Sequence, residues 1–235
     1  MKNLIVFEIF IMTLVFAQFA QGQTVDEVVN KYVSALGGKE MISALSTLKI
    51  EGSMSIMGND VDIVITKKHL VGMRFDISIM GTENYQIITP TKGLVFMPVQ
   101  GMTEPVEMPE EQLMPALAQL DLQGALVNYK EKGTIVELVG KEKVEGEDCY
   151  NLKLTFQTGV VSNYFISEAT SFIVKTSGKT AVNGEDVEVS SSFSNYKKNA
   201  AGYLFAYSLT TMQGQMNFSK IDTNISIDEK VFKGN

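Results

Sequence analysis

The sequence predicts a mainly β protein built on one large, curved antiparallel sheet. From Thr47 onward apolar and polar residues alternate, as they do in strands with one buried and one solvated face. Turn residues such as Asn183-Gly184 separate the alternating segments, and no linker divides the chain into two halves. About 11–12 strands fit the pattern, and a twisted sheet of that size must curve and enclose space.

The first 22 residues have the pattern of a secretory signal peptide. Lys2 supplies the positive charge, Leu4–Phe16 forms an apolar run, and small residues precede a cleavage site before Gln23. The apolar run is too short to span a membrane comfortably. We therefore expect residues 1–22 to be removed on export and residues 23–235 to form one domain.

Two helices should precede the first strand. Thr24 and Glu27 form a capping box, and apolar residues within Val25–Leu36 repeat at the spacing of one helix face. Gly37 ends this helix, and a short second one covers Lys39–Leu45. The expected strands span Leu48–Ile56, Val61–Ile65, Val71–Ile79, Tyr85–Ile88, Leu94–Met97, Thr134–Val144, Cys149–Phe156, Val160–Ile166, Ser171–Thr176, Glu185–Tyr196, Tyr203–Met212 and Gln215–Asn224.

The stretch Pro98–Val127 interrupts the strands, and we call it the insert. It contains four of the five prolines and one segment with a helical pattern, Glu110–Leu120. The apolar side of this helix carries Leu113, Met114, Leu117 and Leu120. A short apolar helix between strands must lie on a face of the sheet. We expect it to be a lid over an apolar pocket.

Composition excludes several classes of function. The net charge is −7 at pH 7 and Arg74 is the only arginine, which argues against nucleic acids and anionic membrane surfaces as partners. The only cysteine, Cys149, cannot form an intrachain disulfide and is interpreted as a buried, inert thiol.

No residues with the pattern of a catalytic or metal site come together in the sequence. The only histidine, His69, follows two lysines and is interpreted as a solvated turn residue. Zinc or iron would need further His or Cys ligands, and a Gly-x-Ser-x-Gly elbow for serine catalysis is absent. Acidic pairs such as Glu110-Glu111 suit helix starts and turns. We expect neither an enzyme nor a cofactor.

Methionines are concentrated in the early strands and in the insert. Met97, Met102, Met108 and Met114 lie in or beside the insert. Methionine is flexible and polarizable, and it suits surfaces that repack around variable apolar partners. Two alternatives stay open: some of these side chains line a ligand cavity, or all of them fill an ordinary core.

Several short segments, taken in order, carry a resemblance to a known family. They are Asn30–Glu40, Leu48–Met54, Arg74, the insert before Gly124–Tyr129, Val139–Gly146, Tyr164–Ile166 and Asn224–Asp228 with Phe232. In this order and spacing the chain resembles the LolA/LolB-like superfamily of lipoprotein-localisation carriers, in particular the secreted outer membrane lipoprotein-sorting type of Gram-negative bacteria. The resemblance covers nearly the whole chain after residue 22.

The resemblance implies an incomplete, or half, antiparallel β-barrel whose concave apolar face is covered by helices and binds acyl chains. It also implies a periplasmic location. In such carriers an arginine on an early strand helps to hold the lid closed, and Arg74 is the residue that could match it. We therefore expect Arg74 to hydrogen-bond with the insert or the N-terminal helices. The tryptophan positions common in relatives are absent, which favours lipid binding over lipoprotein transfer specifically.

We expect a lidded lipid-binding cavity. Its predicted lining is Met54, Ile56, Ile63, Ile65, Met73, Phe75, Ile77, Ile79, Tyr85, Ile87, Phe96, Leu113, Met114, Leu117 and Leu120. The first hypothesis is a monomeric carrier of lipid or lipoprotein acyl chains, with envelope membrane proteins as donor and acceptor. The second is a non-enzymatic envelope scaffold or protein-interaction module with a packed core. The pattern does not fix which strand face is inward, since a one-residue slip reverses a face.

Overall fold

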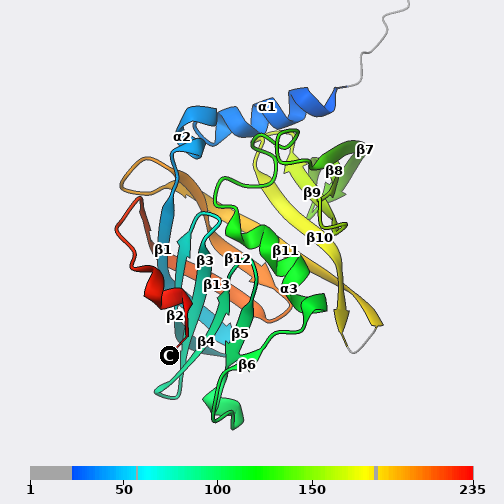
Figure 1. Cartoon of the computed structure of the whole chain (residues 1–235). Helices are drawn as coiled ribbons and strands as arrows, with labels where there is room; N and C mark the ends of the chain where they lie inside the picture. The colour runs from blue at the N-terminus through cyan, green and yellow to red at the C-terminus, as the bar shows by residue number, and fades with distance from the viewer. Residues whose placement is uncertain (1–22, 57, 183–184, 235) are drawn as a thin grey trace, which may run out of the picture.

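The computed structural model describes residues 23–56, 58–182 and 185–234, which form one open antiparallel sheet with a few short helices (Figure 1). Thirteen strands pair in the order β6-β5-β4-β3-β2-β1-β13-β12-β11-β10-β9-β8-β7. Their bounds are β1 Thr47–Ile56, β2 Asn59–Lys68, β3 Gly72–Ile79, β4 Thr82–Ile88, β5 Gly93–Phe96, β6 Val106–Glu107, β7 Ile135–Val144, β8 Glu147–Thr155, β9 Val161–Ser167, β10 Ile173–Val182, β11 Glu185–Lys198, β12 Leu204–Thr211 and β13 Gly214–Thr223. The predicted mainly β half-barrel is confirmed. The predicted signal peptide lies outside the described residues.

The first and last strands of the chain meet in the middle of the sheet, where β1 pairs with β13. From there the early strands run outward to β6 at one edge, and the late strands run inward from β7 at the other edge. The chain passes from β6 to β7 through residues 108–134. This connection, which contains most of the insert, therefore crosses the gap between the edge strands β6 and β7. In a closed barrel these two edge strands would be paired.

α1, Val25–Ala35, and the insert lie on one face of the sheet, which we call the concave face (Figure 1). Ile50, Ile65 and Phe75 are directly paired across β1, β2 and β3, so their side chains share this face. Leu120 of the insert packs against the same residues. Strand alternation therefore places the even residues of β1 and the odd residues of β2 and β3 on the concave face.

The N-terminal helices form where the sequence predicts them. α1, Val25–Ala35, begins with a capping box in which the Thr24 hydroxyl accepts from the Glu27 N–H and the Glu27 carboxylate accepts from the Thr24 N–H. Its buried Val28 and Tyr32 pack against the β8 side of the sheet. α2, Lys39–Ser43, follows. None of the described helices has the length and apolar character needed to cross a membrane.

The helix predicted over Glu110–Leu120 is present but divided. α3 covers Glu110–Ala116 and contains Pro115, and a 3-10 helix, η2, covers Leu117–Leu120. Pro115 has no N–H to donate to the preceding turn, which weakens the α-helix there and favours the tighter 3-10 geometry after it. Strand β6 was not predicted, because two residues are too few to show an alternating pattern. Two further 3-10 helices are η1, Pro98–Gln100, and η3, Glu229–Phe232.

Candidate functional site

The insert packs its leucines onto the apolar floor of the concave face. Leu120 is 4% exposed and belongs to a cluster with Ile65 and Met73, against which Leu113 and Leu117 also pack. Fully burying one such side chain stabilises the folded chain by about 1.5–3 kcal/mol. The predicted apolar side of the insert therefore contacts Ile65, Met73 and Phe75, three of the predicted sheet residues.

A second apolar cluster continues the concave face toward the ends of the same strands. Its members among the predicted lining residues are Met54, Ile63 and Ile77, which are buried, and Ile56, Phe75 and Ile79, which pack against them. Met216 of β13 completes the buried part. The structure thus gathers the predicted residues of β1, β2 and β3 on one face, with Phe75 packed against both clusters.

Three predicted lining residues lie on the opposite face of the sheet. Tyr85, Ile87 and Phe96 pack with Phe232 beneath the C-terminal η3. The pairing of β3 with β4 explains the error, because Ile88, and not Ile87, is the partner of Met73. Alternation made Tyr85 and Ile87 the apolar side of β4, but the C-terminal segment buries that side on the opposite face, while the inward side carries Asn84, Gln86 and Ile88.

Arg74 also lies on this opposite face, so its predicted contact with the insert is wrong. Its Nε donates to Asp76 Oδ1 at 2.7 Å and its guanidinium lies 4.3 Å from the centre of the Tyr85 ring. A weaker bond of 3.4 Å joins it to the Val231 carbonyl. Met73 and Phe75 face inward, and neighbouring residues in a strand point to opposite faces. Arg74 therefore holds the C-terminal segment.

The end of the insert is held instead by the turn between β2 and β3. The Leu70 N–H donates to the Leu120 carbonyl at 2.9 Å, and Lys67 Nζ lies 3.4 Å from the Gln119 carbonyl. Burial lowers the pKa of the Lys67 ammonium to about 8. We call this junction of residues 67–70 with residues 119–122 the clasp. Backbone and side-chain hydrogen bonds of this kind each stabilise by only about 0.5–1.5 kcal/mol.

His69 is part of the clasp and is not the solvated turn residue that the sequence suggested. Its Nδ1 accepts from the Leu122 N–H at 3.2 Å and lies 3.7 Å from Asp121 Oδ1. Asp121 Oδ2 in turn pairs with Lys132 Nζ at 2.5 Å. Since Nδ1 accepts, the proton of the neutral ring sits on Nε2.

Acidification should weaken the clasp. Burial lowers the pKa of His69 below its ordinary 6.5 against the opposing pull of Asp121, and Lys132 lowers it further. Lys67 and Lys68 flank His69 on its own turn, and Lys68 pairs with Glu229. The folded chain thus binds this proton more weakly than the unfolded chain does. The contribution of His69 to the free energy of unfolding is therefore at its full value well above pH 6.5 and falls as the pH drops through 6.5 and below.

Urea unfolding of the wild type and His69→Gln between pH 5 and 8 measures this effect. A glutamine amide can still accept from the Leu122 N–H but does not titrate. We expect the wild type to lose more stability than the variant as the pH falls, because only the wild type has a histidine that titrates at this position. The carboxylates are shared by the two proteins, so their titration cancels in the comparison. Parallel pH profiles for the two proteins would contradict the prediction.

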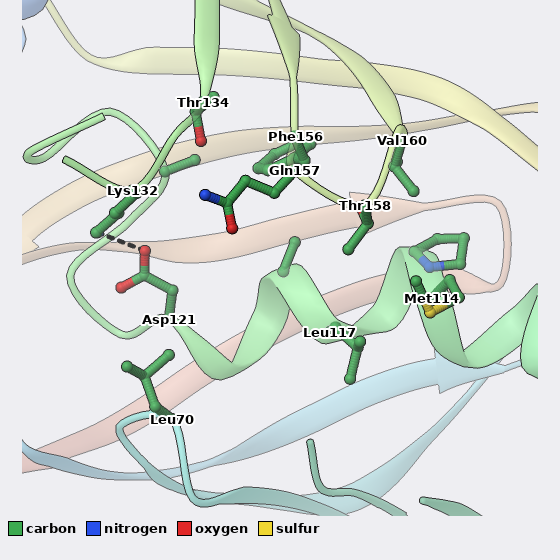
Figure 2. Close-up of a pocket in the computed structure, with 13 residues that line it drawn as sticks. Leu70, Met114, Leu117, Asp121, Lys132, Thr134, Phe156, Gln157, Thr158 and Val160 are labelled. Carbon is green, nitrogen blue, oxygen red and sulfur yellow. Dashed lines mark hydrogen bonds and ion pairs between the residues drawn. The ribbon is translucent and has the colours of Figure 1, made fainter. Parts of the chain in front are cut away.

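Open space lies beside the insert, between it and the turn that joins β8 to β9 (Figure 2). This cavity has a volume of about 240 Å³. Its lining is Leu70, Met114, Pro115, Leu117, Ala118, Asp121, Ala125, Lys132, Thr134, Phe156, Gln157, Thr158 and Val160. A second cavity of about 160 Å³ adjoins it and shares Pro115, Ala118, Phe156 and Val160.

The cavities only partly match the predicted site. Met114 and Leu117 line the first cavity, as predicted for the lid. None of the predicted sheet residues lines either cavity, and Ile65, Met73 and Phe75 pack with the leucines of the insert instead. Phe156 and Val160 were missed. Thr158-Gly159 marks a turn in the sequence, and the apolar residues on both sides of it are the signal that could have identified this wall.

Comparison with known proteins identifies the fold. No family model and no curated protein matches the chain. The solved structure of a LolA superfamily protein from Nitrosomonas europaea is similar over 90% of this chain and 98% of that chain, with 14% identity and a TM-score of 0.56. The chain has the LolA fold.

Two further solved structures are similar at lower scores. A DUF1329 family protein from Desulfovibrio piger is 12% identical over 90% of this chain and 98% of that chain, with a TM-score of 0.49. A domain named as an outer membrane lipoprotein-sorting protein from Vibrio parahaemolyticus is 12% identical over 88% of this chain and 95% of that chain, with a TM-score of 0.47.

The residues around the insert of this LolA-like chain are mostly apolar. Cys149 is fully buried, and burial raises the pKa of its thiol to about 11, so the reactive thiolate is not formed near neutral pH. Within residues 23–56, 58–182 and 185–234, no group of three or more His, Cys, Asp or Glu side chains could hold a metal ion. Apolar contact is what the site offers a ligand.

Proposed function

We propose that this LolA-like chain is a carrier that binds acyl chains of lipids or lipoproteins between its concave face and the insert. The observation that carries the proposal is the row of insert leucines seated on an apolar floor. A segment held there by side-chain burial and a small clasp can be replaced by another apolar group of similar size. Cargo and insert compete for the same surface.

The free energies of burial of the insert leucines and of an acyl chain are similar enough for one to replace the other. Three leucines contribute at most roughly 5–9 kcal/mol, the amount for full burial at about 1.5–3 kcal/mol each, and Leu113 and Leu117 are only partly buried. An acyl chain that buries a dozen CH₂ groups gains roughly 10 kcal/mol, at about 0.8 kcal/mol per group. Because the two amounts are similar, cargo can enter without unfolding the sheet, and the insert can expel it again. A carrier needs both steps.

The location and partners of the carrier form part of the same proposal. Residues 1–22 serve as a signal peptide, and residues 23–235 form a single domain that works in the periplasm as a monomer. It receives and delivers cargo at envelope membrane proteins, and it catalyses no reaction. The acidic net charge of −7 supports a protein that is released from anionic membrane surfaces and does not stay on them.

A second function is favoured by the same packing. The insert covers the concave floor closely, which also suits an envelope scaffold or protein-interaction module whose core binds no ligand. The two functions differ in one measurable property, the uptake of apolar molecules.

Lipid extraction and a binding titration distinguish the two functions. We expect mass spectrometry to find lipid in the natively purified protein, and a fluorescent fatty acid to bind the delipidated protein. Phe75→Ser, on the concave face, should weaken this binding about tenfold by removing apolar contact. Thr66→Ser is the matched control on the opposite face of the neighbouring strand, where it is paired with Arg74. Absence of both extracted lipid and probe binding would favour the scaffold.

A further inference from the structure

Three hydroxyl groups form a row across the floor of the second cavity. Thr176 of β10 is directly paired with Tyr164 of β9 on one side and with Ser191 of β11 on the other. All three line the cavity, and Pro115 and Ala118 of the insert lie over it. Directly paired residues have Cβ atoms about 4.5–5.5 Å apart. The row therefore spans roughly 10 Å, or two strand spacings.

This part of the concave face differs from the part that the insert leucines cover. There the floor carries large apolar side chains such as Ile65 and Met73. Here the next paired row is Ser162 with Gly178, so small side chains leave room under the insert. α3 packs against β10 above this region. The space is a consequence of serine, threonine and glycine at inward positions.

The hydroxyl groups of the row are available to a ligand. Among the described residues, no hydrogen bond joins the side-chain hydroxyl of Tyr164, Thr176 or Ser191 to another protein group, whereas Ser162 donates to the Ser177 carbonyl at 2.9 Å. Burial raises the pKa of Tyr164 to about 12, so its phenol keeps its proton and can donate. All three side chains are half-buried, so their hydroxyls meet water in the cavity, and a ligand acceptor would replace that water.

The charges around the two cavities disfavour an anionic head group. Lys132 is paired with Asp121, and Lys179 lies 3.8 Å from Asp186. A carboxylate or phosphate placed here would need a cation that already has an acidic neighbour. Neutral acceptors, such as ester or amide carbonyls, need only the hydroxyl donors.

We propose that the row Tyr164–Thr176–Ser191 is the polar subsite of the carrier and binds the carbonyl groups of neutral, ester- or amide-linked acyl chains. This rests on the proposed function. Phe156 and Val160, shared by both cavities, connect the subsite to the larger apolar cavity. The hydroxyl donors fix the head of the cargo while its chains replace the insert leucines.

Three ligands with one oleoyl-length chain each test the subsite: methyl oleate, the oleate anion and octadecene. The wild type should prefer methyl oleate. The triple variant Tyr164→Phe, Thr176→Val, Ser191→Ala removes the hydroxyls with little change in shape and should lose at least about tenfold in affinity for methyl oleate. Its affinity for octadecene should stay the same.

Controls separate the possible failures. Thr210→Val removes a hydroxyl from an exposed position on the opposite face and should change none of the affinities. Unchanged methyl oleate binding by the triple variant, or equal binding of all three ligands by the wild type, would overturn the polar subsite while leaving the carrier intact. A wild type that binds none of the three would overturn the carrier itself. Urea unfolding confirms that each variant is folded.

Discussion

Leu120→Asp should bind a fluorescent fatty acid more tightly than the wild type. Leu120 is 4% exposed and its carbonyl accepts from the Leu70 N–H in the clasp. A carboxylate in this apolar contact, together with the lost leucine, should cost the closed insert about 3–5 kcal/mol. When a binding-competent state is scarce, apparent affinity rises in proportion to its population. Release of the insert should therefore raise probe affinity by at least about tenfold.

Hydrogen exchange shows whether the insert is what moves. Amides of residues 113–122 should lose protection in Leu120→Asp, while those of β1 and β13 should keep it. Gln112→Asp is the matched control, because it adds the same charge at an exposed position of α3 outside the clasp. If Leu120→Asp released the insert but left probe affinity unchanged, the concave face would not be the binding surface.

Gly52→Ala should destabilise the whole chain by about 3 kcal/mol or more. Gly52 lies at an irregularity in the pairing of β1 with β13. A Cβ there would lie 2.3 Å from the Asn217 carbonyl oxygen and 2.9 Å from Phe218 Cα, both backbone atoms. Backbone cannot rotate away as a flexible side chain can, so the two strands must separate.

The clash at Gly52 should lower the stability of the whole sheet because of where it lies. β1 and β13 form the junction between the early and late strands of the sheet. Urea unfolding should show a lower midpoint with an unchanged slope. Ser53→Ala, at the next position of the same strand and paired with Asn217, adds no atoms and should shift stability by less than about 0.5 kcal/mol. A Gly52→Ala chain as stable as the wild type would mean that the strands can accommodate a side chain here.

The sequence could predict the class and the order of elements because each has a local cause. Alternation marks strands, the capping box at Thr24 marks a helix start, and the proline-rich stretch marks the insert. The leucine face of the insert was also predicted, since its spacing depends on the helix alone. These patterns depend on neighbouring residues in the sequence and not on contacts between distant strands.

The sheet face on which a strand residue lies, and the distant residues that it contacts, could not be predicted in the same way. Ile87 and Ile88 are adjacent, both are 1% exposed, and only the register with β3 shows which one faces inward. The clasp joins residues more than fifty positions apart, so nothing near His69 in the sequence indicates Leu122 or Asp121. Arg74 was assigned by resemblance, against the alternation that placed Met73 and Phe75 inward.

The connection from β6 to β7, residues 108–134, contains most of the insert and ties its position to the distance between the two edge strands. Any motion that separates the edge strands stretches this connection, and any motion that brings them together relaxes it. In the proposed carrier, the space for bulky cargo and the distance between the edges then change together. A partner that binds either edge strand of such a carrier can load or empty it without contacting the insert.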